Sequence, residues 1–197
     1  MTPQAESILE LFRSRGAYLE GHFRLTSGLH SSQYLQCALV LQYPDVAEKL
    51  GQKLAGELQR RAGGDIQLVV SPALGGLIIG HEVARALGTR FLFTERDASS
   101  KKMALRRGFH ITPGEHAVVV EDVITTGGST HDVVEVLREA GATVSAAGSI
   151  IDRSGGQADV GVPRVALATL AVATHEPEAC PLCARGIPVV KPGSRPS

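Results

Sequence analysis

The apolar residues of this chain recur with a helical period in some segments and form short continuous runs in others. Helical spacing predicts a first helix over residues 3–15, with Gly16 as its stop signal, and a second helix that Asp45 caps and that Gly63 and Gly64 end. Between these helices, residues 18–41 contain many turn residues and only short β-type patterns. We expect this segment to form a small flap.

From residue 66 onward, short apolar runs alternate with helical segments. The runs IQLVV, RFLFTE and AVVVED and residues 143–151 predict strands, whereas LIIGHEVARALG and residues 129–140 predict helices. A strand, a helix and then another strand are typical of a parallel sheet with helices on its faces. The sequence therefore predicts the α/β class.

The segments outside this alternation indicate the domain organisation. Residues 96–115 form a long polar connection without clear periodicity, which is typical of a functional or mobile segment. Prolines accumulate from residue 174 onward, so regular structure should fade there. No internal repeat and no interdomain linker is visible. We therefore predict a single domain over residues 1–197, with an N-terminal hood over residues 1–43 and an irregular, Pro-rich tail over residues 174–197.

Composition narrows the classes of partner. The 197 residues are 43% hydrophobic and balance 20 Lys and Arg against 20 Asp and Glu, so no global field favours nucleic acid or an anionic membrane. The N-terminus lacks the apolar core of a signal peptide, and no apolar run approaches a membrane span. An odd count of three cysteines argues against a disulfide framework. We expect a cytoplasmic protein with no nucleic-acid or membrane partner.

The segment VVVEDVITTGGST, residues 118–130, carries the clearest chemical signal. A buried strand ends in Glu121 and Asp122, and parallel α/β sheets bind ligands beyond the carboxyl ends of their strands. The loop that follows offers consecutive backbone N–H groups at a helix N-terminus, where Gly127 and Gly128 can take left-handed angles. Carboxylates that accept hydrogen bonds from vicinal hydroxyls, next to a cradle for a phosphate monoester, indicate a site for a phosphorylated sugar.

A plain turn and two common nucleotide-binding loops fit this segment less well. A generic turn between a strand and a helix explains TTGGST by itself, but not the paired acids that precede it. A Walker A loop is excluded because the chain has no Gly-Lys-Ser/Thr triplet, and a GxGxxG dinucleotide turn is absent as well.

The buried strand, EDVITTGGST and the helix resemble the phosphoribosyl pyrophosphate (PRPP) motif of the type I phosphoribosyltransferases. SPALGG, residues 71–76, resembles the pyrophosphate loop of that family, and the basic residues 96–108 stand where the family has its mobile catalytic loop. The resemblance covers residues 16–156. It implies a parallel sheet flanked by helices, an N-terminal hood, and transfer of ribose 5-phosphate from PRPP to a nucleobase nitrogen. It also implies Mg²⁺ bound through PRPP oxygens rather than directly by the protein, and a homodimer whose loops serve the neighbouring subunit.

The resemblance assigns roles to individual residues. It implies that Glu121, Asp122, Lys101 and Lys102 are catalytic. It implies a PRPP site made of Ala73, Gly75, Arg96, Lys101, Lys102, Arg106, Glu121, Asp122, Val123, Ile124, Thr125, Thr126, Gly127, Gly128 and Ser129.

Two segments resemble the orotate-using members of the family. GHFRLTSGLHSSQY, residues 21–34, is similar to their N-terminal pattern, and IIDRSGG, residues 150–156, is similar to their segment with a base-contacting arginine, here Arg153. Arg153 and Thr125 would then bind orotate, and the reaction would yield orotidine 5′-phosphate and pyrophosphate in de novo UMP synthesis. Two alternatives stay open. One is an enzyme of the same fold for a purine or xanthine base, and the other is a PRPP-sensing regulator, which would normally need a DNA-binding module.

Three cations of the orotate enzymes are missing or displaced in this chain. Those enzymes commonly carry lysines where Thr26 and Gly75 stand, and a loop with Lys and His where this chain has ERDASSKKMALRRGF. Pyrophosphate needs positive partners. The available substitutes are Arg96, Lys101, Lys102, Arg106 and Arg107.

His175, Cys180 and Cys183 form an H-x4-C-x2-C pattern in the tail. This spacing could supply three zinc ligands, but the sequence shows no evident fourth ligand, and complete structural sites usually have four. We therefore expect an ordinary turn with buried thiols. A redox C-x-x-C pair fits less well still, because the pair does not open a helix after a strand. His22 and His30 lie in a polar segment near the proposed cleft, and neither is expected to act as a general base.

Overall fold

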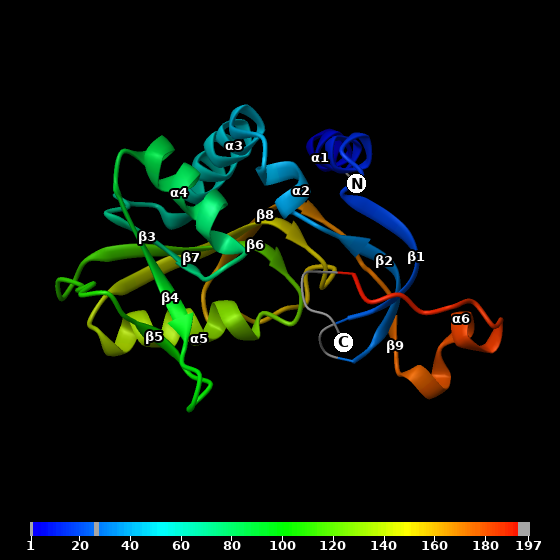
Figure 1. The fold of residues 1–197 in the computed structure, drawn as a ribbon. Coiled ribbons are helices and arrows are strands. Elements are labelled where there is room, and N and C mark those ends of the chain that lie inside the picture. Colours follow the sequence, from blue (N-terminus) through cyan, green and yellow to red (C-terminus); the bar gives the residue numbers. More distant parts are fainter. Residues whose placement is uncertain (1, 26–27, 193–197) are drawn as a thin grey trace.

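The computed structural model describes residues 2–25 and 28–192, which form a large sheet and a smaller one beside it (Figure 1). The large sheet has the strand order β5-β4-β3-β6-β7-β8, and only β5 runs antiparallel to its neighbour. Its strands are β3 (Leu68–Pro72), β4 (Arg90–Arg96), β5 (Met103–Leu105), β6 (His116–Ile124), β7 (Thr143–Asp152) and β8 (Arg164–Thr169). The structure confirms the predicted α/β class with a mostly parallel sheet.

Helices cover both faces of the large sheet (Figure 1). Helices α1 (Pro3–Ser14), α3 (Pro44–Ala62) and α4 (Gly76–Leu87) pack on one face, and α5 (Gly128–Glu139) packs on the other. The stripe of Leu50, Leu54 and Leu58 along α3 is at most 1% exposed. Burial of each such leucine contributes roughly 1.5–3 kcal/mol, so the i, i+4 pattern fixes which side of α3 faces the sheet.

The smaller sheet, which we call the hood, joins the two ends of the chain. It consists of β1 (Tyr18–Arg24), β2 (His30–Leu35) and β9 (Thr174–His175), all antiparallel, and the short α2 (Ala38–Leu41) leads from it to α3. Beyond β9 the tail forms a 3-10 turn (Pro177–Ala179) and α6 (Pro181–Ala184), and then returns to pair Val190 with Phe23. The tail therefore packs on the hood rather than extending away from it.

Several local predictions need correction. Asp45 does not cap α3, because Tyr43 holds the cap position and Asp45 lies within the first turn. The strand predicted to end at Glu121 and Asp122 continues to Ile124, where it pairs with Asp152. Strands β5 and β8 were not predicted. The position of Thr26, one of the departures from the orotate pattern, lies outside the described residues.

Where the sequence predicted fading structure, the described part of the tail, residues 174–192, contains the two-residue β9, two short helical pieces and the bridge of Val190. Among the residues that the structure describes, no helix combines the length and the apolarity needed to cross a membrane.

Candidate active site

The chain reverses its direction of travel across the large sheet between β3 and β6. From β3 it passes through α4 to β4 on one side, and it later returns to β6 on the other side of β3. Connections that leave two such strands in opposite directions open a crevice at the carboxyl ends of those strands. The SPALGG residues run from the last two positions of β3 to the first position of α4, and Glu121 and Asp122 lie in the last part of β6. Two segments predicted for the site therefore meet at this crevice.

Glu121 and Asp122, which we call the acid pair, are largely withdrawn from water. The hydroxyl of Thr130 donates to Oε2 of Glu121 at 3.1 Å, and the backbone N–H of Val123 donates to Oδ1 of Asp122 at 2.8 Å. Burial, followed by the neighbouring Asp122 charge, raises the pKa of Glu121 to about 8. Burial also raises the pKa of Asp122. Buried carboxylates of this kind favour ligands that bring hydrogen-bond donors or positive charge.

The raised pKa predicts how Glu121 affects stability. In the folded, ligand-free chain Glu121 titrates near pH 8 rather than near its ordinary value of 4.5, so its favourable contribution is complete below about pH 4.5 and is lost as the pH rises through 8. Replacement by Gln removes this titration. As the pH rises from roughly 5 to 8.5, the free energy of unfolding of Glu121→Gln should increase relative to that of the parent by at least about 1 kcal/mol. This corresponds to an increase of about 2–4 °C in the Tm difference.

Scanning calorimetry of both proteins without ligand measures this difference. Glu135→Gln is the control, because Glu135 of α5 is half-exposed and pairs with Arg138. A Tm difference between Glu121→Gln and the parent that stays constant across this pH range would contradict the buried, proton-binding Glu121.

The loop after β6 forms the cradle that the sequence predicts. Gly127 precedes α5 with φ 85°, and a Cβ at this position would lie 2.9 Å from Val160, so conformation and space both require glycine. A cavity of about 80 Å³ is lined by Glu121 and by residues 123–130. These include every residue between 123 and 129 that the resemblance implied for PRPP. The first residues of α5 line this cavity, and the free N–H groups and the positive dipole end of a helix N-terminus favour an anion there.

The SPALGG loop borders the acid pair. A Cβ added to Gly75 would lie 2.6 Å from Oδ1 of Asp122, so the two residues are in contact. The peptide bond between Ala73 and Leu74 in this loop is cis. The lysine that orotate enzymes commonly carry at the position of Gly75 would therefore have to displace the Asp122 carboxylate here. Glycine instead of lysine at position 75 therefore agrees with the close approach of Asp122.

A larger cavity of about 640 Å³ adjoins the cradle, because Thr125 and Thr126 line both. Its volume lies within the range of small-molecule sites, roughly 300–1,000 Å³. The predicted orotate residues Thr125 and Arg153 both lie on its wall. The other lining residues come from the hood and from the segments after β7 and β8: Leu25, Leu29, Tyr34, Ser154, Ala171, Val172, Ala173 and Thr174. These eight lining residues were not predicted individually, although the flap that contributes Leu25, Leu29 and Tyr34 was predicted.

Arg153 directly follows β7 and is partly buried. Its backbone N–H donates to the Ile124 carbonyl at 2.8 Å, and its Nη2 donates to the Gln33 carbonyl at 3.4 Å. Its Nε is buried and finds no hydrogen-bond partner among the described residues. Burial also lowers the pKa of this guanidinium. Since an unsatisfied buried donor costs roughly 1–3 kcal/mol, Arg153 favours a ligand that presents an acceptor oxygen.

A buried ion pair holds the turn that carries Arg153. The Asp152 carboxylate, which is fully buried, pairs with Arg164 of β8. It also accepts from the backbone N–H of Ser154 at 2.8 Å and from the Ser154 hydroxyl at 2.6 Å. This pair positions a cavity wall and was not predicted from the sequence. The Asp in IIDRSGG was the available signal, but its partner Arg164 stood in a segment with no prediction.

The basic segment of residues 96–107 lies apart from both cavities. Strand β5 pairs with β4 to form a hairpin, and Arg96 reaches Asp132 of α5 at 3.1 Å. Arg106 pairs with Asp97, and Arg107 pairs with Glu95 at 2.8 Å. Neither cavity is lined by a residue of this segment. Of the predicted PRPP residues, Arg96, Lys101, Lys102 and Arg106 are therefore not brought to the acid pair in this conformation.

The structure brings the tail cysteines to two histidines of the hood, and His175 is not among them. Cys180 and Cys183 lie with His22 and His30 in one group of possible metal ligands. The H-x4-C-x2-C spacing therefore pointed to the correct cysteines but to the wrong histidine, His175. Strands β2 and β9 pair His30 with His175 along the backbone, but the His175 side chain is not part of the group.

The resemblance implies a Mg²⁺ ion that PRPP oxygens hold, and the residues at the acid pair are compatible with such an ion. The acid pair supplies two carboxylates beside the cradle, and oxygen is the ligand that Mg²⁺ prefers. Among the described residues, the one cluster of three or more possible metal ligands is the His-Cys group in the hood. Its nitrogen and sulfur atoms do not suit Mg²⁺. The described part of the chain thus offers no cage that would hold Mg²⁺ without a substrate.

A parallel sheet with a phosphate cradle and a buried acid pair at its switch point defines an α/β protein that binds a phosphorylated sugar. The family model described as a phosphoribosyl transferase domain matches residues 41–169. The orotate phosphoribosyltransferase of Pelotomaculum thermopropionicum is 55% identical over 190 residues, which cover 96% of this chain and 97% of that protein. That of Thermotoga maritima is 50% identical over 188 residues, covering 95% and 98%. This chain therefore belongs to the phosphoribosyltransferase family, among its orotate phosphoribosyltransferases.

Solved structures agree with this assignment. The crystal structure of orotate phosphoribosyltransferase from Aeropyrum pernix superposes with a TM-score of 0.67 at 30% identity, covering 83% of this chain and 93% of that one.

Proposed function

We propose that this chain transfers the 5-phosphoribosyl group of PRPP to orotate, giving orotidine 5′-phosphate and pyrophosphate for de novo UMP synthesis. The observation that carries the proposal is the pair of adjoining cavities that share Thr125 and Thr126. One is lined by Glu121 and the cradle residues, and the other is lined by Arg153, whose buried Nε has no hydrogen-bond partner among the described residues. A phosphorylated ribose in the first and a planar, acidic base in the second would meet where the two cavities join.

The residues around the smaller cavity would hold the ribose 5-phosphate. The backbone N–H groups of residues 125–129 and the α5 dipole would bind the phosphate, and the acid pair would accept hydrogen bonds from the ribose hydroxyls. In this role the two carboxylates also face the ring on which positive charge develops as pyrophosphate departs. Donors from the ribose hydroxyls and the positive charge of Mg²⁺ would lower the raised pKa values of the ligand-free acid pair, and the ionised carboxylates would then stabilise that transition state more than the ground state.

Pyrophosphate would leave toward the SPALGG loop, which borders Asp122. Mg²⁺ bound to PRPP oxygens would supply neutralising charge for the leaving group. As the bond from N1 of orotate to the ribose forms, N1 gives up its proton, which a departing pyrophosphate oxygen or water can accept. The proposed reaction then depends mainly on position and on charge neutralisation. Lys101 and Lys102 are the exposed cations that we propose approach the leaving group when the basic segment moves.

This movement gives a testable prediction for residues 96–114. The ion pair of Arg96 with Asp132 ties the segment to α5, and Arg106 pairs with Asp97 inside the segment. Binding of these two arginines to pyrophosphate therefore requires both pairs to open. We expect amide hydrogen exchange in residues 97–110 to slow on addition of PRPP and Mg²⁺. Amides of the buried helix α3 serve as the internal control and should be unchanged. Equal exchange rates with and without PRPP would argue against a closing segment.

Orotate as the acceptor rests on the larger cavity and on the relatives. The relatives that cover nearly this whole chain are named orotate phosphoribosyltransferases. Arg153 presents a planar set of donors to a planar base with carboxylate and carbonyl oxygens. A purine or xanthine enzyme of the same fold, and a PRPP-sensing regulator without chemistry, are the alternatives that an assay should separate.

One experiment tests the proposal against both alternatives. The chain is incubated with PRPP, Mg²⁺ and, in separate reactions, orotate, uracil, adenine, guanine or xanthine, and the nucleotides are then separated. We expect orotidine 5′-phosphate in the orotate reaction and no nucleotide in the others. A purine nucleotide would support the first alternative, and PRPP binding without any product would support the regulator.

We propose in addition that two copies of the chain associate and that the protein works in the cytoplasm. Exposed apolar side chains on one side of the large sheet, Leu74 and Ile78 at the start of α4 and Leu39 and Tyr43 near the start of α3, fit a surface that a second copy covers. Sedimentation equilibrium measures the association. The three cysteines form no disulfide in the structure, which is typical of a reducing compartment.

A further inference from the structure

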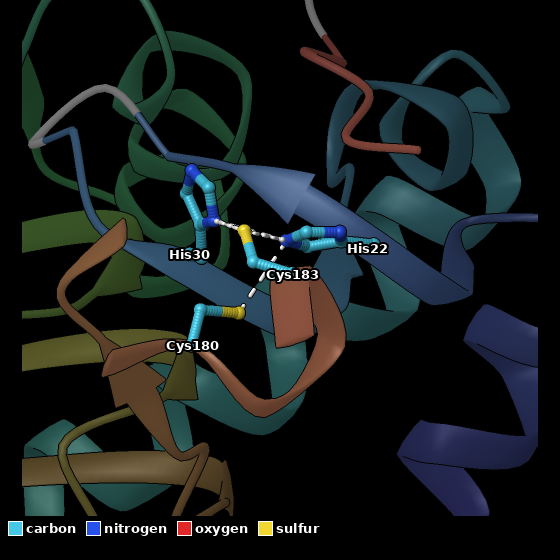
Figure 2. Close-up of side chains that lie close together, drawn as sticks. All are labelled: His22, His30, Cys180 and Cys183. Carbon is cyan, nitrogen blue, oxygen red and sulfur yellow. Dashed lines mark hydrogen bonds between the residues drawn. The ribbon is translucent and has the colours of Figure 1, made fainter. Parts of the chain in front are cut away.

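Four side chains from opposite ends of the chain converge in the hood (Figure 2). His22 comes from β1, His30 from β2, and Cys180 and Cys183 from the tail. Each offers one nitrogen or sulfur atom, and these four atoms all lie within 4.8 Å of one another. His22, His30 and Cys180 are at most 5% exposed, whereas Cys183 is exposed. The group belongs neither to the acid pair nor to the lining of the two cavities.

From this group we infer a structural zinc site that fastens the tail to the hood. The first argument is hydrogen bonding. Nδ1 of His22 lies 2.7 Å from the Ile187 carbonyl, which can only accept, so Nδ1 carries a proton and Nε2 of neutral His22 has a single lone pair. That one lone pair faces Nδ1 of His30 at 2.9 Å and the sulfurs of Cys180 and Cys183 at 3.4 and 3.7 Å. Three possible donors compete for one acceptor.

A metal ion at the centre resolves this competition. Each of the four atoms would then direct one lone pair at the ion, and the thiols would bind as thiolates. The His22 contact to Ile187 is the kind of outer hydrogen bond that fixes the tautomer and orientation of a metal-binding imidazole. Two thiolates also balance the double positive charge of the ion, so the largely buried site would be neutral overall and would need no further counter-charge.

Three of the six separations among these atoms match a tetrahedral site, and all six are at most 4.8 Å. Ligand bonds of about 2.0–2.1 Å for nitrogen and about 2.3 Å for sulfur give ligand-to-ligand separations of roughly 3.3–3.8 Å. The separation of Cys183 Sγ from His30 Nδ1 is 3.3 Å, and the separations of the sulfurs from His22 Nε2 are 3.4 and 3.7 Å. The two imidazole nitrogens, at 2.9 Å, need to move apart by only a few tenths of an ångström.

The ligand chemistry selects zinc over other ions. Two thiolates and two imidazoles in a tetrahedron are typical of structural Zn²⁺ sites, whereas Mg²⁺ and Ca²⁺ prefer oxygen ligands. All four positions are filled by the protein, so the site has no open position for substrate or water. We therefore assign it a structural role.

The site would join segments that also line the larger cavity. His22 and His30 flank the connection between β1 and β2, whose Leu25 and Leu29 line that cavity. A β-bulge between the Glu20 and Phe23 pairings contains His22, and bulges of this kind redirect side chains. The tail runs alongside: Val190 donates to the His22 carbonyl at 2.8 Å and accepts from the Arg24 N–H at 2.9 Å. Zinc would thus hold one wall of the proposed base pocket in place.

The test uses the full-length chain without a histidine tag. After zinc loading and dialysis, elemental analysis should find about one zinc per chain. Replacement by Co²⁺ should produce a thiolate-to-cobalt charge-transfer band together with the visible bands of a tetrahedral site. Zinc removal by a chelator should lower the Tm and raise the KM for orotate more than the KM for PRPP. The metal count and the cobalt spectrum do not depend on the proposed activity, so the inference and the proposed function can fail separately.

Two variants separate this site from the sequence pattern. Cys183→Ser removes an exposed ligand and should weaken zinc binding by at least about 100-fold. His175→Ala removes the histidine of the H-x4-C-x2-C pattern, which lies outside the group, and should bind zinc as the parent does. If Cys183→Ser does not fold, the cobalt spectrum of the parent decides, and the absence of a charge-transfer band overturns the inference. A zinc-free chain after loading, a Cys180–Cys183 disulfide in freshly reduced protein, or loss of zinc in His175→Ala would overturn it as well.

Discussion

Asp122→Asn is expected to lower kcat for orotidine 5′-phosphate synthesis by about 100-fold or more, the cost typical of removing one preorganised electrostatic group. The carboxylate lies in contact with Gly75 of the SPALGG loop, where pyrophosphate is proposed to leave. Its charge would stabilise the positive ribose ring of the transition state, and an amide of the same shape cannot do so. Glu121→Gln should have the same effect to a milder degree.

The fold should tolerate this change. The amide oxygen of Asn can still accept the hydrogen bond from Val123, which the Asp122 carboxylate accepts at 2.8 Å. Because burial raises the pKa of Asp122, the parent loses stability on ionising this group, and Asn removes that loss. The Tm of Asp122→Asn should therefore equal or exceed that of the parent at neutral pH.

Steady-state kinetics and calorimetry on the same preparation separate the two effects. Asp45→Asn provides a matched control, since Asp45 is an exposed carboxylate in the first turn of α3 that pairs with Lys49 at 3.6 Å. Its kcat should stay within about twofold of the parent. Turnover of Asp122→Asn close to the parent value would remove the basis for the ribose site.

The geometry of the cradle was predictable because it is local in sequence, whereas its role in binding phosphate stays a prediction. The strand, the acid pair, the loop and the start of α5 all lie within residues 118–130, so the order of residues already fixes their order in space. Only the length of β6 was underestimated. The sequence could not reveal that Asp122 contacts Gly75, because that contact depends on β3 and β6 being neighbours in the sheet.

The larger cavity and the His-Cys group were harder to predict because their parts are far apart in sequence. His22 and Cys180 are separated by 158 positions, and the nearby His175 gave a more obvious but incorrect spacing. The buried pair of Asp152 with Arg164 depends on β8, which has only six residues and had no clear strand signal. Short elements such as β5 and β8 acquire their structure from the neighbouring strand rather than from their own pattern.

The basic segment shows a different limit. Its cations were predicted for PRPP from their number and position, yet Arg96 and Arg106 form ion pairs with Asp132 and Asp97 in the described conformation. A sequence does not show whether a cation is paired with an acidic residue elsewhere or already lies at the binding site. Their role in binding therefore stays a prediction, which hydrogen exchange with PRPP can test.

Arg153→Ala is expected to lower kcat/KM for orotate by roughly 10- to 150-fold, since a charge-assisted hydrogen bond contributes about 1.5–3 kcal/mol. The buried Nε without a partner and the position of Arg153 on the wall of the larger cavity carry this expectation. Binding of PRPP should change far less, because the cradle lies at the other end of the site. Arg153→Lys keeps a positive charge but loses the planar fork, so it should recover only part of the loss.

Kinetics with each substrate varied at saturation of the other measure this selectivity. Arg138→Ala is the matched control, because Arg138 of α5 is 45% exposed and pairs with Glu135 on the helix surface. It should leave both KM values within about twofold of the parent. The expected result for Arg153→Ala is a raised KM or lowered kcat/KM confined to orotate, with the Tm little changed because Asp152 and Arg164 still hold the turn. Orotate parameters within twofold of the parent would show that the base is recognised elsewhere in the cavity, and a loss that fell equally on PRPP would point to disruption of the turn instead.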